Sequence, residues 1–246
     1  MNTSIKGIVL SSGGVDSTTA LGLAIKSLGQ ENIISVSVSY GQRHSRELDA
    51  AEKIAQYYGI RHEVIDLSAI YQYSNCALLK HSSKEIPEGS YAEQLEDRET
   101  GVDTAVPFRN GLMLSAVAAL AQSIFPDDDI NIYLGNHADD AAGNAYADCS
   151  PEFSEAIGRA IWLGTYKRVA VLTPFVHMNK SQVVRQGLEL GVPYELTTSC
   201  YKGGKKACGR CGTCLDRIAA FEANGVKDPI EYETYEEDNN GNMENK

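Results

Sequence analysis

Ser12-Gly13-Gly14-Val15-Asp16-Ser17 stands where a short apolar segment gives way to a helical pattern. Residues 7–10 predict a buried strand, and the apolar spacing of residues 18–28 predicts a helix. Glycines at such a turn let the backbone approach a bulky anion, and the first turn of the helix offers free N–H groups. The stretch therefore predicts a phosphate or pyrophosphate site. The alternative is an ordinary turn in which Asp16 or Ser17 caps the helix.

The loop lacks the lysine that follows the glycines in a Walker A loop, G-x-x-x-x-G-K-[ST]. A site that holds pyrophosphate without that lysine suits attack at the α-phosphate better than transfer of the γ-phosphoryl group. The sequence of the loop therefore favours adenylation with release of pyrophosphate.

The composition limits the class of protein. The chain has 246 residues, of which 43% are hydrophobic, and its formal net charge is −11. This length suits one sizeable α/β domain with an appendage, and the charge argues against non-specific binding of nucleic acid. No apolar run approaches the ~20 residues of a membrane span, and the N-terminus carries no signal-peptide pattern. We expect a cytoplasmic protein with no membrane partner.

Strand and helix patterns alternate along the chain. Apolar, β-branched segments that predict further strands occur at residues 32–40, 62–67, 129–135 and 169–172. Patterns that predict helices occur at residues 46–58, 111–124, 151–163 and 180–190. Such alternation predicts an α/β fold with a mainly parallel sheet covered on both faces, and ligands that bind at the carboxyl ends of the strands. Residues 74–107 lack periodicity and predict a long loop or a mobile lid.

Four of the six cysteines fall within fifteen residues, as Cys200-x7-Cys208-x2-Cys211-x2-Cys214. In a cytoplasmic protein this spacing favours a metal over disulfides, and four thiolates make a closed tetrahedral zinc site. An iron–sulfur cluster, or disulfides and free thiols, are the alternatives. Nearby basic side chains would offset the thiolate charge: Lys202, Lys205, Lys206 and Arg210.

The acidity is concentrated at the C-terminus. From Lys227 onward there are seven acidic residues and two lysines, with an Asn-Asn-Gly-Asn run among them. That composition predicts a solvated, disordered tail. We therefore expect an α/β nucleotide-binding domain over residues 1–195, a helical four-cysteine appendage over 196–225 and a disordered tail over 226–246.

Five blocks of sequence occur in order along the chain. They are Ser12-Gly13-Gly14-Val15-Asp16-Ser17-Thr18-Thr19, Tyr40-Gly41-Gln42-Arg43-His44-Ser45, Val106-Pro107-Phe108-Arg109-Asn110, Tyr146-Ala147-Asp148-Cys149-Ser150-Pro151-Glu152-Phe153, and Thr198-Ser199-Cys200-Tyr201 with the three cysteines that follow. Over about residues 6–221 the chain resembles the 7-cyano-7-deazaguanine synthase family of queuosine biosynthesis, within the PP-loop ATP pyrophosphatases. One block alone is weak evidence, but five in order are strong.

The resemblance implies a Rossmann-like parallel sheet of the PP-loop type with a small four-cysteine zinc appendage. It implies an ATP-dependent ligase that makes 7-cyano-7-deazaguanine from 7-carboxy-7-deazaguanine and ammonia through adenylated acid and amide intermediates. The cofactors and partners it implies are ATP, Mg²⁺, one structural Zn²⁺ per chain and a second copy of the chain in a homodimer, with no direct nucleic-acid partner.

The resemblance also assigns roles to residues. ATP would contact Ser11, Ser12, Gly13, Gly14, Val15, Asp16, Ser17 and Thr18. The substrate would contact Tyr40, Gln42, Arg43, His44, Arg109, Asn110, Asp139 and Asp140, and Cys200, Cys208, Cys211 and Cys214 would bind the zinc. We expect Asp16 near magnesium, Arg109 on a carboxylate or phosphate, and Lys180 on the ATP phosphates, and we expect all three to be catalytic. Solvated surface positions are the alternative for Arg109 and Lys180.

Two departures from the family pattern leave the final product open. The family usually has glycine where Phe108 stands, so the loop before Arg109 could be shaped differently. Residues 135–145, which the resemblance places over the deazaguanine, are longer than the common version and differ in sequence. The alternatives are a ligase that stops at the amide or uses another amine, an RNA sulfurtransferase that uses Cys149 or the cysteine cluster, and a non-enzymatic nucleotide-binding module.

Overall fold

The computed structural model describes residues 5–96, 101–233, 235–237 and 243–245. Its main sheet consists of β1 (Ile5–Leu10), β2 (Ile33–Ser39), β3 (Arg61–Asp66), β4 (Asp129–Tyr133) and β5 (Val169–Leu172). The strands pair in parallel in the order β3-β2-β1-β4-β5. This order confirms the predicted Rossmann-like α/β fold. It also places a topological switch point between β1 and β4, where ligands bind in such sheets.

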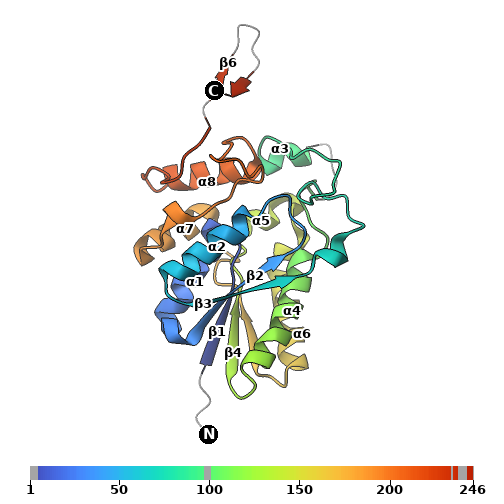
Figure 1. Cartoon of the computed structure of the whole chain (residues 1–246), viewed down its shortest axis with the longest axis vertical. Coiled ribbons are helices and arrows are strands. Elements are labelled where there is room, and N and C mark those ends of the chain that lie inside the picture. Colours follow the sequence, from blue (N-terminus) through green and yellow to red (C-terminus); the bar gives the residue numbers. More distant parts are fainter. Residues whose placement is uncertain (1–4, 97–100, 234, 238–242, 246) are drawn as a thin grey trace.

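Five helices cover the two faces of the sheet: α1 (Val15–Leu28), α2 (Arg46–Tyr57) and α7 (Lys180–Leu190) on one, and α4 (Arg109–Ile124) and α6 (Pro151–Gly164) on the other (Figure 1). Strand residues alternate between these faces because successive side chains of a strand point in opposite directions. Ile8 and Leu10 pack with α4 and α6, whereas Val9 packs with α1 and α7. Burial on both faces explains why the strands read as continuous apolar runs.

The segment from residue 74 to residue 107 is a long loop with one short helix, α3 (Tyr91–Leu95). Residues 97–100 lie outside the described part of the chain. The loop is anchored at both ends, because Cys76, Leu79 and Val106 are buried in a cluster with Tyr40. The sequence predicted either a long loop or a mobile lid for this segment, and the described residues fit the long loop.

The four-cysteine region lies beyond the carboxyl ends of the strands, together with α8 (Gly212–Glu222) and α3, at the opposite end of the molecule from the N-terminus (Figure 1). It is packed into the main body. Ala220 and Phe221 of α8 share an apolar cluster with Val184 of α7, and the N–H of Thr198 donates to the carbonyl of Gly13 at 2.9 Å. None of the helices in the described ranges is long and apolar enough to cross a membrane.

The expectation of a disordered tail from residue 226 is wrong for its first part. Arg217 is fully buried and binds both carboxylate oxygens of Asp228, at 2.7 and 2.9 Å. The hydroxyl of Tyr232 donates to the same carboxylate at 2.6 Å, and the carbonyl of Glu231 accepts the N–H of Ala207 at 2.9 Å. Composition could not reveal this, because Asp228 pairs with a buried arginine that sits on another element. Further on, β6 (Tyr235–Glu237) and β7 (Met243–Asn245) pair in antiparallel fashion, and residues 234, 238–242 and 246 lie outside the described part.

Removal of residues 227–246 would leave Arg217 buried without its carboxylate. We expect the free energy of unfolding in urea to fall by about 3–5 kcal/mol, the usual loss when one partner of a buried ion pair is deleted. Removal of residues 234–246 alone keeps Asp228 and Tyr232, and should change stability by less than about 0.5 kcal/mol. Equal unfolding midpoints for both truncated chains and the full chain would contradict this assignment.

Candidate active site at the carboxyl ends of the strands

A cavity lies at the carboxyl ends of β1, β2 and β4, on the switch point of the sheet. Leu10, Val38 and Leu134 contribute apolar side chains where these strands end. Further lining residues come from the loop before α1, the segment after β2 with the start of α2, the starts of α4 and α7, the segments after β4 and before α6, α3 and the four-cysteine region. The position is the one that the alternating sequence pattern predicts.

Residues 12–17, here called the phosphate loop, comprise the turn before α1 and the first residues of that helix. Hydrogen bonds to the hydroxyl groups of Ser12 and Ser17 hold this turn in place. Ser17 Oγ accepts the N–H of Ser12 at 3.1 Å, and the N–H of Gly14 donates to Ser12 Oγ at 3.3 Å. Gly14 is the N-cap of α1 and no side chain caps the helix, so the cap alternative for Asp16 and Ser17 is wrong. No capping side chain therefore blocks the first turn of α1, whose N–H groups can bind an anion in the cavity.

Two glycines are required by close packing around this loop. Gly13 has φ of 74°, and a Cβ there would lie 2.5 Å from the carbonyl oxygen of Glu47 on α2. Gly135, just after β4, would place a Cβ 2.8 Å from the carbonyl oxygen of Asp16. The loop after β4 thus lies directly against the start of α1.

Lys180 is buried at the first position of α7, with 9% of its surface exposed. Its Nζ lies 2.5 Å from Asp16 Oδ2, and its backbone N–H donates to Asp139 Oδ2 at 2.7 Å. Burial disfavours the charge of Asp16, but Lys180 and His137 outweigh it and hold the pKa of that carboxyl below its usual value. Burial likewise opposes the charge of Lys180, and Asp16 overcomes it and raises the pKa of the amine. Both groups therefore remain charged, and the surface alternative for Lys180 is wrong.

The second oxygen of Asp16 is an open ligand atom. Asp16 Oδ1 is buried and has no hydrogen-bond partner among the described residues, and it lies 3.8 Å from His137 Nε2. The same ring nitrogen lies 3.5 Å from Asp140 Oδ1, and Asp216 of α8 also lines the cavity. Carboxylate oxygens are the ligands that Mg²⁺ prefers, so the unpaired Asp16 Oδ1 has the chemistry that such a cation requires.

Arg109 is the first residue of α4, and its side chain lines the cavity. Its guanidinium forms no ion pair with a carboxylate of the described ranges, and its Cζ lies 5.8 Å from the centre of the Tyr40 ring. The residue before it, Phe108, has φ of 51° and ψ of 32°. This left-handed conformation is costly for a bulky side chain and suits glycine, the residue that the resemblance led us to expect there.

Three tyrosines form a hydrogen-bonded group in the cavity wall. Tyr201 Oη lies 3.0 Å from Tyr91 Oη and 3.4 Å from Tyr146 Oη, and Tyr146 also bonds Thr104 at 2.7 Å. Burial is the main cause that raises the pKa of all three phenols, so they stay neutral. Together with Tyr40 they offer aromatic surface and polar edges to a planar heterocycle.

Asn110 and Asn136 are tied to the same cysteine. Asn110 Nδ2 lies 3.2 Å from Cys149 Sγ, and Asn136 Nδ2 donates to the carbonyl of Cys149 at 2.9 Å. Asp148 accepts the backbone N–H of Asn110 at 2.8 Å. Burial raises the pKa of the Cys149 thiol well above its usual value, so the group stays protonated.

Three predicted substrate residues do not line the cavity. Arg43 donates to the carbonyls of Ala77, Ser82 and Lys84 and so holds the long loop. His44 Nε2 bonds the Tyr201 carbonyl at 3.0 Å, and Asp139 accepts the first N–H of α7. These side chains form hydrogen bonds with backbone groups of other segments, and a single sequence could not show those contacts. Tyr40, Gln42, Arg109, Asn110 and Asp140 do line the cavity, as do Ser11, Ser12, Gly14, Asp16 and Ser17 of the expected ATP set.

Gly13, Val15 and Thr18 serve the packing of the loop instead of lining the cavity. Val15 is fully buried, and Thr18 Oγ1 donates to the Gly14 carbonyl at 2.7 Å. The expected set also lacked several residues that do line the cavity: Glu47, Tyr91, Asn136, Tyr146, Tyr201 and Asp216. Tyr146 and Tyr201 lie inside the sequence blocks that carry the resemblance, so the sequence could have indicated them as site residues. Tyr91 and Asp216 lie outside those blocks, and no pattern in the sequence indicated them.

The four cysteines of the appendage form a cluster that can hold a metal ion. Their sulfur atoms lie within 4.8 Å of one another and all four residues are buried. A tetrahedral site with Zn–S bonds of about 2.3 Å separates its sulfurs by about 3.8 Å, which agrees with the 4.0 Å between Cys208 and Cys214. All six cysteines are unpaired, so the disulfide alternative is wrong.

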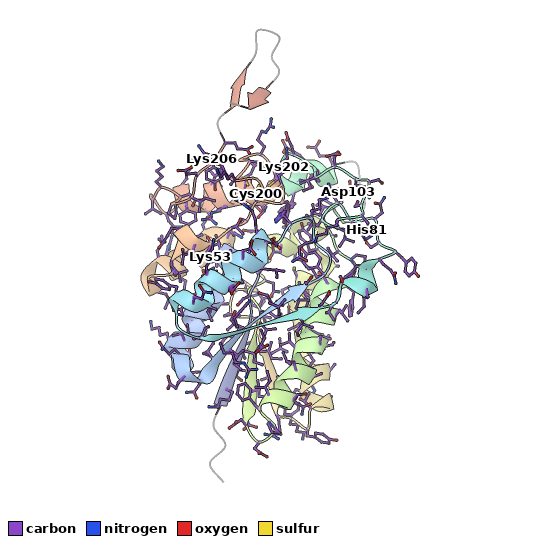
Figure 2. The ribbon with its side chains drawn as sticks, viewed as in Figure 1. Lys53, His81, Asp103, Cys200, Lys202 and Lys206 are labelled. Atoms are coloured by element: carbon purple, nitrogen blue, oxygen red, sulfur yellow. The ribbon has the colours of Figure 1, made fainter. Side chains whose placement is uncertain are left out.

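The basic residues around the cluster bind acids instead of sulfur. Lys202 and Arg210 both pair with Glu88, and Lys206 pairs with Glu231. Figure 2 shows Lys202 and Lys206 at the same end of the molecule as Cys200. Backbone N–H groups face the sulfurs, with that of Cys211 3.4 Å from Cys208 Sγ. Peptide N–H groups therefore stabilise thiolate charge at short range, while Lys202, Lys206 and Arg210 form their ion pairs with acids.

Comparison with known proteins gives consistent matches. The family model described as queuosine biosynthesis protein QueC matches residues 6–225. The 7-cyano-7-deazaguanine synthase of Caldicellulosiruptor bescii is 44% identical over 229 residues, which cover 93% of this chain and 98% of that protein. The enzyme of the same name from Thermoplasma acidophilum is 42% identical over 236 residues, 94% of this chain and 93% of that one. Among solved structures, the NH3-dependent NAD synthetase of Campylobacter jejuni has a TM-score of 0.45 and 13% identity, over 92% of this chain and 77% of that chain.

Proposed function

The chain belongs to the queuosine biosynthesis protein QueC family, and from this membership we propose that it is an ATP-dependent ligase that makes 7-cyano-7-deazaguanine from 7-carboxy-7-deazaguanine and ammonia. The observation that supports this best is one cavity with two complementary parts. An anion seat at the start of α1 suits the phosphates of ATP, and an arginine without an ion-pair partner in the described ranges, set among tyrosines, suits a planar ring that carries a carboxylate.

The chemistry requires activation because a carboxylate repels nucleophiles and oxide is a poor leaving group. In the proposed reaction a carboxylate oxygen attacks the α-phosphorus of ATP, and pyrophosphate leaves with the electrons of the broken P–O bond. Ammonia then adds to the acyl carbon, AMP leaves, and the extra proton on nitrogen passes to water. Adenylation of the amide oxygen, followed by loss of AMP and of the N–H protons, leaves the nitrile.

Different residues of the cavity would bind the phosphates, the cation and the carboxylate, according to their charge. N–H groups of α1 and the Lys180 ammonium would bind the phosphates, because Asp16 and His137 together contact only two of the three donors of that group. Asp16 Oδ1 would hold Mg²⁺, which supplies neutralisation of phosphate charge. Arg109 would bind the carboxylate in a bidentate manner and orient it toward the α-phosphate.

We propose that the four-cysteine cluster binds one structural zinc ion. A single ion has no open position when four thiolates surround it, and the close spacing of the sulfurs supports one ion better than a larger iron–sulfur cluster. The resemblance also predicts a homodimer, which remains a prediction.

Sulfur transfer to RNA is a weaker candidate. It would need a reactive thiolate, and the raised pKa of Cys149 keeps that thiol protonated next to Asn110. A ligase that stops at the amide stays as the second candidate. It is favoured by the unusual residues 135–145, which form α5 (Ala138–Ala141) and the turns beyond it near the cavity.

The proposed function predicts AMP and pyrophosphate as products, and no ADP. Purified protein should be incubated with ATP, magnesium, ammonium chloride and 7-carboxy-7-deazaguanine, and the products separated by mass. We expect one AMP to be released for each amide that forms, and a second AMP when that amide is converted to the nitrile. Stoichiometric ADP would refute the role of the phosphate loop. An amide that accumulates without any nitrile would favour the second candidate.

Elemental analysis should find about one zinc per chain in colourless protein. Replacement Cys211→Ser should abolish tight binding and lower stability sharply, since structural zinc contributes ~10–16 kcal/mol of apparent binding energy in small motifs. Cys76→Ala, at a buried cysteine outside the cluster, should keep the zinc. Iron with visible absorption would contradict the zinc assignment.

Arg109→Ala should reduce kcat/KM for the carboxylate substrate by about 10²–10³, the usual loss when one preorganised donor is removed. Burial raises the pKa of the nearby Glu47 carboxyl and the charge of Arg109 opposes this, so the melting temperature must show that the variant still folds. Arg159→Ala is the matched control, because this arginine lies 4.7 Å over the Trp162 ring on α6 and outside the cavity. Full activity of Arg109→Ala would remove Arg109 from the site.

A further inference from the structure

Asn136 is a buried amide in the cavity wall with one unused atom. Its residue is 5% exposed, and it lies directly after Gly135 in the loop that follows β4. Its Nδ2 donates to the carbonyl of Cys149 at 2.9 Å and to Ser154 Oγ at 3.1 Å, which engages both hydrogens. A carbonyl can only accept, so these bonds also fix which end of the amide is nitrogen.

The oxygen of this amide lacks a donor. Asn136 Oδ1 is buried and has no hydrogen-bond partner among the described residues, although the residue lines the cavity. Buried acceptors in folded proteins nearly always have a partner, and an unpaired one costs about 1–3 kcal/mol. A ligand in the cavity that carries N–H groups would supply the missing bond.

The position of Asn136 lies between the two functional parts of the cavity. On one side, Gly135 packs against the backbone of Asp16 at the phosphate seat. On the other side, Cys149 links Asn136 to Asn110, the neighbour of Arg109. A carboxylate held by Arg109 and activated at the phosphate loop would have its carbon between these parts, in the cavity whose wall Asn136 helps to form.

We propose that Asn136 Oδ1 forms the ammonia-binding subsite of this enzyme and positions ammonia for attack on the activated carboxyl carbon. The proposal rests on the ligase function above. The bound ammonia donates an N–H to Oδ1 and directs its lone pair to the carbon. The C–N bond forms, the bond to the AMP oxygen breaks with its electrons, and the surplus proton leaves to water.

A neutral acceptor suits this task better than a carboxylate. Asp16, Asp140 and Asp216 all line the cavity, and a carboxylate in contact with ammonia would stabilise ammonium, which has no lone pair to attack with. An amide oxygen accepts the hydrogen bond without adding charge. The fixed orientation of Asn136 thus selects the nucleophilic form at the place where it is used.

Two assays on the full-length enzyme separate this subsite from the ligase function. Carboxylate-dependent exchange of pyrophosphate into ATP, without ammonium, reports adenylation alone. Formation of amide and nitrile at increasing ammonium chloride reports the nucleophile. We expect Asn136→Ala and the milder Asn136→Ser to raise KM for ammonium about tenfold or more, with pyrophosphate exchange within about twofold of wild type. Ser154→Ala removes one anchor of the amide and keeps Oδ1, and should leave KM for ammonium near wild type.

The outcomes are distinguishable. Wild-type protein without carboxylate-dependent exchange would refute the ligase itself. Normal exchange with an unchanged KM for ammonium in either folded Asn136 variant would overturn the subsite alone. A parallel loss of exchange and of product formation at every ammonium concentration, shared by Ser154→Ala, would also overturn it, because Asn136 would then only support the loop.

Discussion

The buried ion pair between Lys180 and Asp16 is the interaction on which the site depends. It joins the first turns of α7 and α1, which are 164 residues apart in sequence, across the switch point of the sheet. A cation at a helix N-terminus is disfavoured by ~0.3–1 kcal/mol because it meets the positive end of the helix dipole. Asp16 offsets that cost, and Asp139 binds the first N–H of α7. Two helix N-termini can therefore converge on one anion-binding cavity.

A second buried pair, Arg217 with Asp228, connects the four-cysteine region to this site. Arg217 also donates to Thr197 Oγ1 at 2.8 Å, and the next residue, Thr198, bonds the carbonyl of Gly13. The fully buried guanidinium of Arg217 thus connects the chain after α8 with the segment that links the cysteine cluster to the phosphate loop. A metal in the cluster would stabilise α8 and, through it, the wall of the cavity that includes Tyr201 and Asp216.

The two ends of the cavity differ in their side chains. Asp16 and Lys180 form an ion pair at the starts of α1 and α7, whereas phenols and amides, together with the Glu47 carboxyl, lie near Arg109. Phe108 shows the cost of this arrangement. It is held in the left-handed region to begin α4 at Arg109, and its ring lies 5.8 Å from that of Phe153 and directly over Gly111, where a Cβ would clash.

The sequence by itself determined the strands and helices of the main body, since apolar periodicity and glycine turns are local properties of the chain. It also determined the four-cysteine cluster and the phosphate loop, because their residues lie close together in sequence. Tertiary structure alone decided that Lys180 is buried on Asp16, that Asp228 pairs with Arg217, and that Arg43 and His44 bind backbone carbonyls instead of lining the cavity. Each of these outcomes depends on which partner a side chain meets across the fold, and a charge in a single sequence carries no record of its distant partner.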